Sequence, residues 1–87
     1  MTKSDFLDQP PSGAALTAYD QAHIKLYLRL LDADAEGADW KEVVEVLFGI
    51  DARAETDRAL RVYTAHLKRA KWIRDNGFRE LSDRQQH

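Results

Sequence analysis

Four long side chains on one predicted helix could bind a phosphate or a protein partner. Between residues 56 and 77, helical spacing places Arg61, Ala65, Lys68, Arg69 and Trp72 on one face, opposite the predicted core. Arginine and lysine contact phosphates, and tryptophan and arginine often dominate the binding energy of protein interfaces. This face is therefore either an ordinary solvated surface or a contact surface for phosphates or for a protein.

A second group of charges lies in an acidic stretch. Its members are Asp32, Asp34, Glu36 and Asp39. With Gly37 they resemble the start of a calcium-binding EF-hand loop, but position 12 of such a loop must carry a bidentate carboxylate, and here it is Val43. We therefore expect an acidic turn without a metal. It is a second candidate surface, suited to covering a basic DNA-binding face.

No residue pattern indicates catalysis or a cofactor. His23 and His66 lie on separate predicted helices beside apolar faces, and spacing places no third metal ligand near them. Ser4, Ser12 and Ser82 lie in polar segments, and no glycine-rich phosphate loop is present. The lack of cysteine excludes disulfides and thiolate metal sites. We predict a protein that is not an enzyme and has no metal, cofactor or small-molecule ligand.

The composition is typical of one small soluble domain. The 87 residues are 44% hydrophobic and 32% charged. No apolar run approaches the ~20 residues of a membrane span, and the N-terminus lacks the apolar core of a signal peptide, so we expect a cytoplasmic protein. The net charge is −2, which argues against a general nucleic-acid binder. The charge is uneven: residues 1–52 hold four basic and ten acidic side chains, whereas residues 53–87 hold nine and five.

Hydrophobic spacing predicts three main helices. The first runs from Leu16 or Thr17 to Ala35, the second from Asp39 to Gly49, and the third from Thr56 to Gly77. The fold class is therefore all-α, a domain of three to four helices in which the second and third form a helix-turn-helix-like pair. We expect a flexible segment at 1–13, a helical domain at 14–82 that Phe78 and Leu81 help to close, and a frayed end at 83–87.

The residue types also predict the helix ends and core faces. Asp39 and Glu42 fit a capping box in which Asp39 accepts from the third helical N–H, and Thr56 fits an N-cap. Gly37 and Gly49 should end the first two helices, and Asn76-Gly77 the third. The expected apolar face of the first helix is Ile24, Tyr27, Leu28 and Leu31, extended by Tyr19, Leu26 and Leu30. That of the third helix is Leu60, Tyr63, Leu67, Ala70 and Arg74, widened by Ala59, Val62, His66 and Ile73.

The order of three motifs resembles one protein family. They are VVEVLFG, LRVYTAHLKRAKWI and NGFREL, and with the gaps between them they lie within residues 24–81. The residues that carry the likeness are Leu47-Phe48-Gly49, Leu60-Arg61 and Gly77-Phe78-Arg79-Glu80-Leu81. Together they resemble the RovC-like C-terminal DNA-binding domain family, formerly a domain of unknown function. The resemblance implies a regulator of transcription or of the transfer of integrative elements, with the long helix as a recognition helix.

The middle of the long helix departs from the family pattern. Tyr63-Thr64-Ala65-His66 stands where DNA-binding members carry an arginine-rich run, which weakens the expected attraction to DNA. A stand-alone domain short of arginines resembles the QseM-type antiactivators of rhizobial integrative and conjugative elements. This resemblance implies a protein that binds transcription activators and so represses conjugative transfer. The implied targets are a LuxR-class quorum-sensing activator, an activator with the same domain, or both.

Our hypothesis from the sequence is a cytoplasmic antiactivator that binds protein through the face described first, with Trp72 as its anchor. The alternative is a weak or accessory helix-turn-helix regulator that uses the same helix to bind DNA. The two differ in the salt dependence of DNA affinity, which is steep for true phosphate contacts. A role as a toxin–antitoxin partner or as a purely structural partner also stays open.

Overall fold

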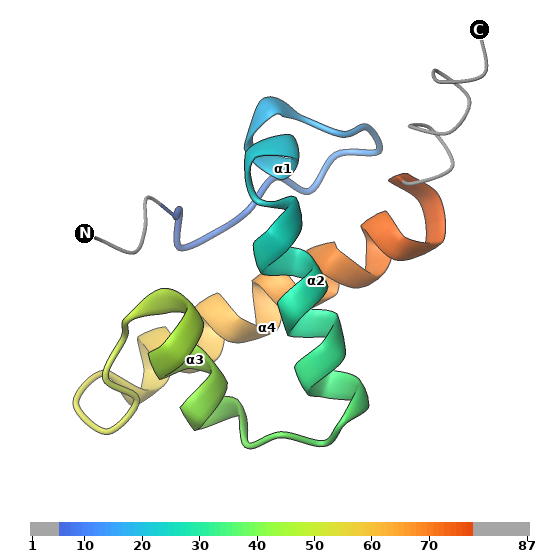
Figure 1. The fold of residues 1–87 in the computed structure, drawn as a ribbon. Coiled ribbons are helices and arrows are strands. Elements are labelled where there is room, and N and C mark those ends of the chain that lie inside the picture. The colour runs from blue at the N-terminus through green and yellow to red at the C-terminus, as the bar shows by residue number, and fades with distance from the viewer. Residues whose placement is uncertain (1–5, 78–87) are drawn as a thin grey trace, which may run out of the picture.

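The computed structural model describes residues 6–77, which form four α-helices and one π-helical segment, with no strand among them. The elements are α1 Ala18–Ala22, α2 Ile24–Ala35, α3 Trp40–Phe48, α4 Thr56–Trp72 and η1 Ile73–Gly77 (Figure 1). The prediction of an all-α domain of three to four helices is confirmed.

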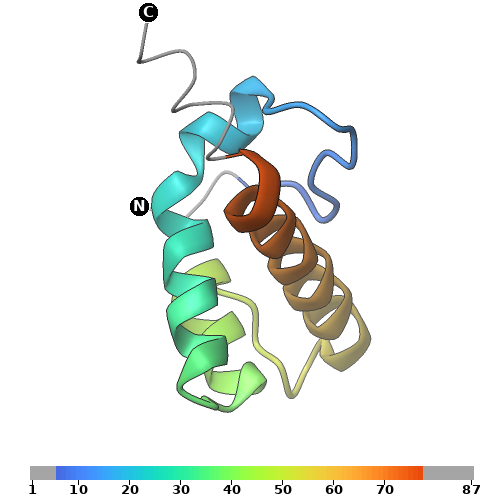
Figure 2. The same ribbon diagram turned by 90° about the vertical axis from the view of Figure 1, so that its right-hand side faces the viewer.

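The long helix α4 packs across α2 and α3. Figure 1 shows α2 and α3 in front of α4, and the quarter turn of Figure 2 places α2 and α4 on opposite sides of the molecule. The core between these layers includes Tyr27 and Leu30 of α2, Val44 and Phe48 of α3, and Val62 of α4. Residues 49–55 connect α3 to α4, so these two helices form the expected helix-turn-helix-like pair, with a longer connection than usual.

The first predicted helix is divided in two at His23. A capping box starts α1: the Asp20 N–H donates to the Thr17 hydroxyl, and the Thr17 N–H donates to the Asp20 carboxylate. At His23 the backbone leaves the helical region, with φ −116° and ψ 22°, and the ring Nδ1 donates to the Tyr19 carbonyl at 2.8 Å. The Tyr19 carbonyl still accepts from the His23 backbone N–H at 3.1 Å, so the helix breaks at the dihedral angles of His23 and not through loss of that bond. The prediction of one continuous helix up to Ala35 is therefore wrong.

Two glycines with positive φ end α2 and α3, as predicted. Gly37 has φ 72° and Gly49 has φ 71°, a left-handed conformation that strains other residues. After α2 the Gly37 N–H donates to the Asp34 carbonyl, and the Ala38 N–H donates to the Ala33 carbonyl. This pair of bonds is a Schellman motif, which satisfies carbonyls that the helix end would leave without a partner.

Asp39 is the N-cap of α3, but the capping box predicted there is not formed. Its carboxylate accepts from the Lys41 N–H at 3.0 Å, which is the second helical position and not the third. Within residues 6–77, the Glu42 side chain makes no hydrogen bond back to Asp39. Because the cap closes one residue early, the Glu42 carboxylate stays at the surface.

The ends of α4 also differ from the prediction. Glu55 occupies the N-cap position without a side-chain hydrogen bond, and the Thr56 hydroxyl donates to the Ala52 carbonyl at 2.7 Å. In the connection before α4, the Asp51 carboxylate accepts from the backbone N–H groups of Arg53 and Ala54 and closes a turn. Thr56 is therefore already inside the helix. At the other end the chain continues as η1, and Asn76 keeps a negative φ where a left-handed close was expected.

The buried stripe of α4 lies to one side of the predicted one. The buried residues of α4 and η1 are Ala59, Val62, His66, Arg69, Ala70 and Ile73. The expected centre is more open, because Leu60 is 45% exposed and Arg74 lies at the surface. The reason is that α4 is covered by both α2 and α3, which meet it on the Val62 side. On α2, likewise, Leu30 is buried and Leu28 is 44% exposed.

Several predictions for the chain ends are not decided by the structure. Those for Phe78, Leu81 and residues 83–87 lie outside the described residues. The division into a flexible segment at 1–13 and a helical domain at 14–82 stays a prediction. Within residues 6–77, no helix is long and apolar enough to span a membrane.

We expect Gly37→Ala to lower the free energy of unfolding by about 1 kcal/mol, because alanine is strained at positive φ. Packing should not contribute, since no atom lies within 4 Å of the added Cβ. Gly13→Ala is the matched control, because its Cβ also meets nothing within 4 Å and its φ is not positive. Urea denaturation compares the two variants, and equal stabilities would contradict the assignment of strain to Gly37.

Candidate functional site

Residues 6–16, which we name the strap, lie beside α4 before the chain enters α1 (Figure 2). The Phe6 ring packs edge-on against Phe48, with ring centroids 5.0 Å apart. The Leu7 N–H donates to the Tyr19 hydroxyl at 2.9 Å. Phe6 thus packs against the core from within the segment that the sequence predicts to be flexible.

An exposed ion pair joins the strap to the first turns of α4. The Asp8 carboxylate accepts from Arg58 Nε at 3.0 Å and from Arg58 Nη2 at 2.9 Å. The hydrogen bond between them is the main reason that the pKa of Asp8 is lowered and the pKa of Arg58 is raised. Because both side chains are open to water, the pair adds little to stability.

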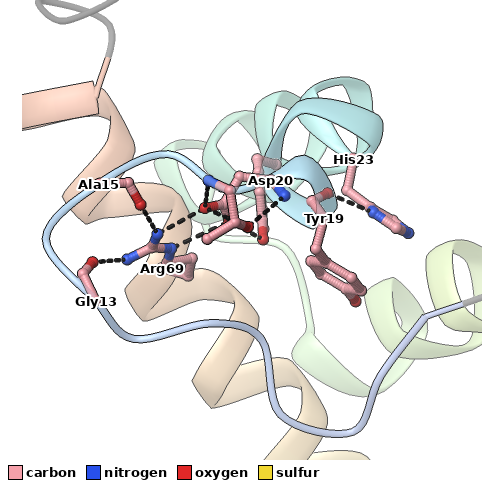
Figure 3. A network of polar contacts seen from close by, with 8 residues as sticks. Gly13, Ala15, Tyr19, Asp20, His23 and Arg69 are labelled. Atoms are coloured by element: carbon pink, nitrogen blue, oxygen red, sulfur yellow. Dashed lines mark hydrogen bonds and ion pairs between the residues drawn. The ribbon is translucent and has the colours of Figure 1, made fainter.

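A buried ion pair ties α4 to α1 and to the strap (Figure 3). Arg69 Nη2 lies 2.6 Å from Asp20 Oδ2, and Arg69 Nε lies 3.1 Å from Asp20 Oδ1. The same guanidinium donates to the Gly13 carbonyl at 2.7 Å and to the Ala15 carbonyl at 2.9 Å. Arg69 is 5% exposed and Asp20 is fully buried. Arg69 is thus a structural residue that orders the strap.

Asp20 accepts hydrogen bonds from two further residues. The Tyr27 hydroxyl donates at 2.9 Å, and the Thr17 N–H and hydroxyl donate at 3.0 and 3.1 Å. Burial alone would raise the pKa of Asp20, but these hydrogen bonds and that of Arg69 outweigh it and lower the pKa to about 2. Burial, and next the bond to Asp20, raise the pKa of Tyr27, so its hydroxyl stays protonated and can donate. Asp20 is therefore ionised at neutral pH.

The prediction that Arg69 belongs to an exposed binding face is wrong. Arg69 falls on the buried stripe of α4, in sequence with Val62, His66 and Ile73 at steps of three or four residues. That spacing is a signal in the sequence, as is the capping pattern that begins at Thr17. The partner Asp20 is 49 residues away, and no local pattern could show that the two side chains meet.

The other four residues of the predicted face remain at the surface of α4. Arg61 and Lys68 are exposed, and Ala65 and Trp72 are half-buried. The Arg69 guanidinium lies 4.3 Å from the centroid of the Trp72 ring, which places a cation over the ring face. The buried arginine thus holds the orientation of the tryptophan that the sequence singles out as an anchor.

A groove runs between the strap and α4. Its volume is about 310 Å³, and it is lined by Gln9, Pro10, Pro11, Ser12, Ala65, Lys68, Arg69 and Trp72. Ala65, Lys68 and Trp72 are thus brought together with the two prolines, whereas Arg61 does not line the groove. A hollow with prolyl and aromatic walls and a lysine among its lining residues has the size and chemistry to hold an apolar side chain of a partner protein.

Most of the positive charge on α4 and η1 is paired within the fold. The basic residues there are Arg58, Arg61, Lys68, Arg69, Lys71 and Arg74. Four of them form ion pairs, which are Arg58 with Asp8, Arg69 with Asp20, Lys71 with Asp34, and Arg74 with Asp75. For Arg61 and Lys68, no ion pair is formed with any residue of the described range 6–77. Acidic Glu55 and Asp57 stand at the N-terminal end of α4, where a recognition helix would meet base edges.

His66 is buried among aromatic rings beneath the strap. Its Nδ1 lies 2.8 Å from the Val62 carbonyl, which can only accept, so this nitrogen carries a proton. Burial is the main cause that lowers the pKa of His66, and the neutral ring can then accept from the Tyr19 hydroxyl at 2.9 Å from Nε2. Tyr19 in turn accepts from Leu7, so His66 supports the strap from below. Nowhere in residues 6–77 do three His, Asp or Glu side chains gather as metal ligands.

The acidic turn lies at the opposite end of α2 from the strap. Asp32, Asp34, Glu36 and Asp39 are all exposed there. Asp34 lies 3.5 Å from Lys71, and Asp39 caps α3, so these two carboxylates already have partners. Asp32 and Glu36 form no ion pair with any other described residue, and they are the part of this surface that is open to a partner.

The comparison with known families gives one match. One family model matches residues 4–82, and it is described as a T6SS transcription factor DNA-binding domain. The chain belongs to this RovC DNA-binding domain family. The family is one of transcription regulators and is not a class of enzymes. No curated protein matches the chain.

We expect Asp20→Asn to lower the free energy of unfolding by about 3–5 kcal/mol, because it leaves the buried Arg69 charge without its counter-ion. The matched control is Asp8→Asn, which breaks an exposed arginine–carboxylate pair and should change stability by less than about 1 kcal/mol. Urea denaturation measures both. Similar small losses for the two variants would show that the buried pair does not hold the fold together.

Stability should also fall as the pH drops below about 6.5, the ordinary pKa of histidine. The folded protein lowers the pKa of His66, so between the two values the unfolded chain binds more protons than the folded one. The contribution of His66 to the free energy of unfolding is therefore fully present above pH ~6.5, and it is lost as the pH falls toward the pKa of His66 in the folded protein. Urea midpoints between pH 5 and 8 measure this slope, which should be smaller in His66→Gln. The same slope in both proteins would contradict the assignment to His66.

Proposed function

We propose that this protein is a transcription regulator that acts by binding another protein through α4. The proposed contact residues are Arg61, Ala65, Lys68 and Trp72, with Trp72 as the anchor. Arg69, which the sequence places among them, is assigned the role of orienting Trp72 and the strap. The proposal rests on one observation: four of the six basic side chains of α4 and η1 are held in internal ion pairs beside an open, largely apolar groove.

Charge argues for a protein partner over DNA. Duplex DNA attracts proteins mainly through Lys and Arg contacts to phosphates, and each contact adds to the affinity. Pairing with Asp8, Asp34 and Asp75 reduces what three surface cations offer to a phosphate. Glu55 and Asp57 at the start of α4 would repel the phosphate backbone of DNA at the point where a recognition helix enters the major groove.

The resemblance to QseM-type antiactivators suggests the class of partner. We propose that the target is a transcription activator, either of the LuxR class or with the same domain as this chain. Binding would keep that activator from promoting conjugative transfer of an integrative element. Asp32 and Glu36 are a proposed second contact, because their free carboxylates suit the basic DNA-binding surface of an activator.

The family match favours a second candidate, a weak or accessory DNA-binding regulator. The matched family is described as a DNA-binding domain, and α3 and α4 keep a helix-turn-helix-like arrangement. In that case Arg61 and Lys68 would be the phosphate contacts. Binding through so few cations would need a partner or a neighbouring domain to become tight at physiological salt.

Affinity capture from the native host tests the main proposal. The tagged chain is used as bait in lysate treated with nuclease, and we expect it to retain a transcription activator. Trp72→Ala should lower the affinity for the captured activator about 30-fold, because removal of an interface anchor costs ~2 kcal/mol.

Trp40→Ala is the matched control for this experiment. Both tryptophans are half-buried, but Trp40 packs against Tyr63 on the side of α4 away from the groove. Trp40→Ala should lose about as much stability as Trp72→Ala, but it should keep its affinity for the captured activator. Equal loss of binding in the two folded variants, or capture that disappears with nuclease, would contradict a protein-binding role for the Trp72 face.

A further inference from the structure

A second apolar surface lies on α2 and α3, separate from the face of α4. Val46 on α3 is 69% exposed. Leu26 of α2 and Leu47 of α3 line the same hollow as Val46 and are only partly buried. An aliphatic side chain so open to water, beside two leucines that are partly open, is unfavourable in an isolated small domain and indicates a surface that is covered by a partner.

Two adjoining hollows form one groove along this surface. The first, of about 470 Å³, lies by Lys25 and Leu26, and the second, of about 260 Å³, lies by Ala33 and Glu42. Both are lined by Arg29, Val46 and Leu47, so they are continuous. No residue of α4 or of the strap lines either hollow.

The charges along this groove are arranged with opposite signs at its two ends. Lys25 lines only the first hollow, Glu42 lines only the second, and Arg29 lies between them. None of the three forms an ion pair with another residue in the described part of the chain. In particular, Glu42 has not closed the capping box with Asp39, and its carboxylate is available to a partner.

Such a groove is complementary to itself. A two-fold axis through its centre would place the basic end of one copy against the acidic end of the other, and the two Val46 side chains against each other. Isologous pairing of this kind is the commonest way in which a surface patch is buried in an oligomer. Two opposite-charge contacts and a shared apolar strip would then form from one set of residues.

We propose that the groove between α2 and α3 is the interface of a symmetric homodimer. In the dimer Lys25 of one copy faces Glu42 of the other, around an apolar centre at Val46. The surface formed by two short helices is small, so the dimer forms at micromolar or higher concentrations. The homodimer does not depend on the proposed function, because the groove shares no residue with the face of α4. That face stays open on both copies.

Sedimentation equilibrium of the whole chain over micromolar to millimolar concentrations tests the dimer. We expect the mass to rise from 10.0 kDa toward twice that value. Val46→Asp should keep the mass of a monomer throughout, and because Val46 is 69% exposed the change should leave the fold intact, which circular dichroism checks. Leu60→Asp is the matched control, since Leu60 is also exposed but lies on α4 outside the groove, and it should dimerise as the unmodified chain does.

A charge exchange tests the pairing itself. Lys25→Glu and Glu42→Lys should each weaken dimerisation at least tenfold, and the double variant, which restores opposite charges across the axis, should recover it. A monomer at every concentration, or no recovery in the double variant, would overturn the proposal. If the chain is monomeric but Val46→Asp lowers capture of a host protein, the groove belongs to that protein and the homodimer is wrong. Loss of the homodimer leaves the Trp72 test unchanged, so the two proposals fail separately.

Discussion

The buried pair of Arg69 and Asp20 joins three parts of the chain that local forces alone would not bring together. Asp20 lies in the short helix α1, Arg69 lies near the end of α4, and the two remaining donor directions of the guanidinium reach carbonyls of the strap. Desolvation of two charges is unfavourable, and only good geometry with additional hydrogen bonds offsets it. Tyr27 and Thr17 supply those bonds to the carboxylate. Without the pair, the strap would still have its contacts at Phe6, Leu7, Asp8 and Leu16.

This constraint also explains why a basic helix has so little basic surface. Arg69 is turned into the fold, and the exposed carboxylates of Asp8, Asp34 and Asp75 pair with three more cations of α4 and η1. The arginine that is buried is also the one that covers the Trp72 ring, so the same side chain removes charge from the surface and fixes an aromatic anchor beside the strap. Under the proposed function, a domain of a DNA-binding family keeps its fold while its long helix binds a protein in place of phosphates.

Local patterns predicted most of the secondary structure, whereas long-range contacts decided the site. Three features could be predicted because each depends on neighbours within one or two turns. They are the glycines at 37 and 49, the N-cap at Asp39 and the period of α4. The break at His23 was not predicted, because a change of dihedral angles at one residue leaves the hydrophobic spacing of the two flanking helices unaltered. Arg69 was assigned to the surface because arginine is usually exposed, and its partner is 49 residues distant. The contribution of the strap could not be predicted for the same reason, because its order comes from groups on α1 and α4.

The salt dependence of DNA affinity measures most directly how much positive charge the fold leaves on α4. The chain is titrated into a labelled DNA duplex over a series of salt concentrations, and the slope of log affinity against log salt gives the number of phosphate contacts. Among the six basic side chains of α4 and η1, only Arg61 and Lys68 form no ion pair with a described residue. We therefore expect DNA binding through this helix to show a slope no steeper than about −2, at roughly 0.9 for each contact. A slope near −5, as all six basic side chains of α4 and η1 would give, would contradict the internal pairing and favour DNA as the partner.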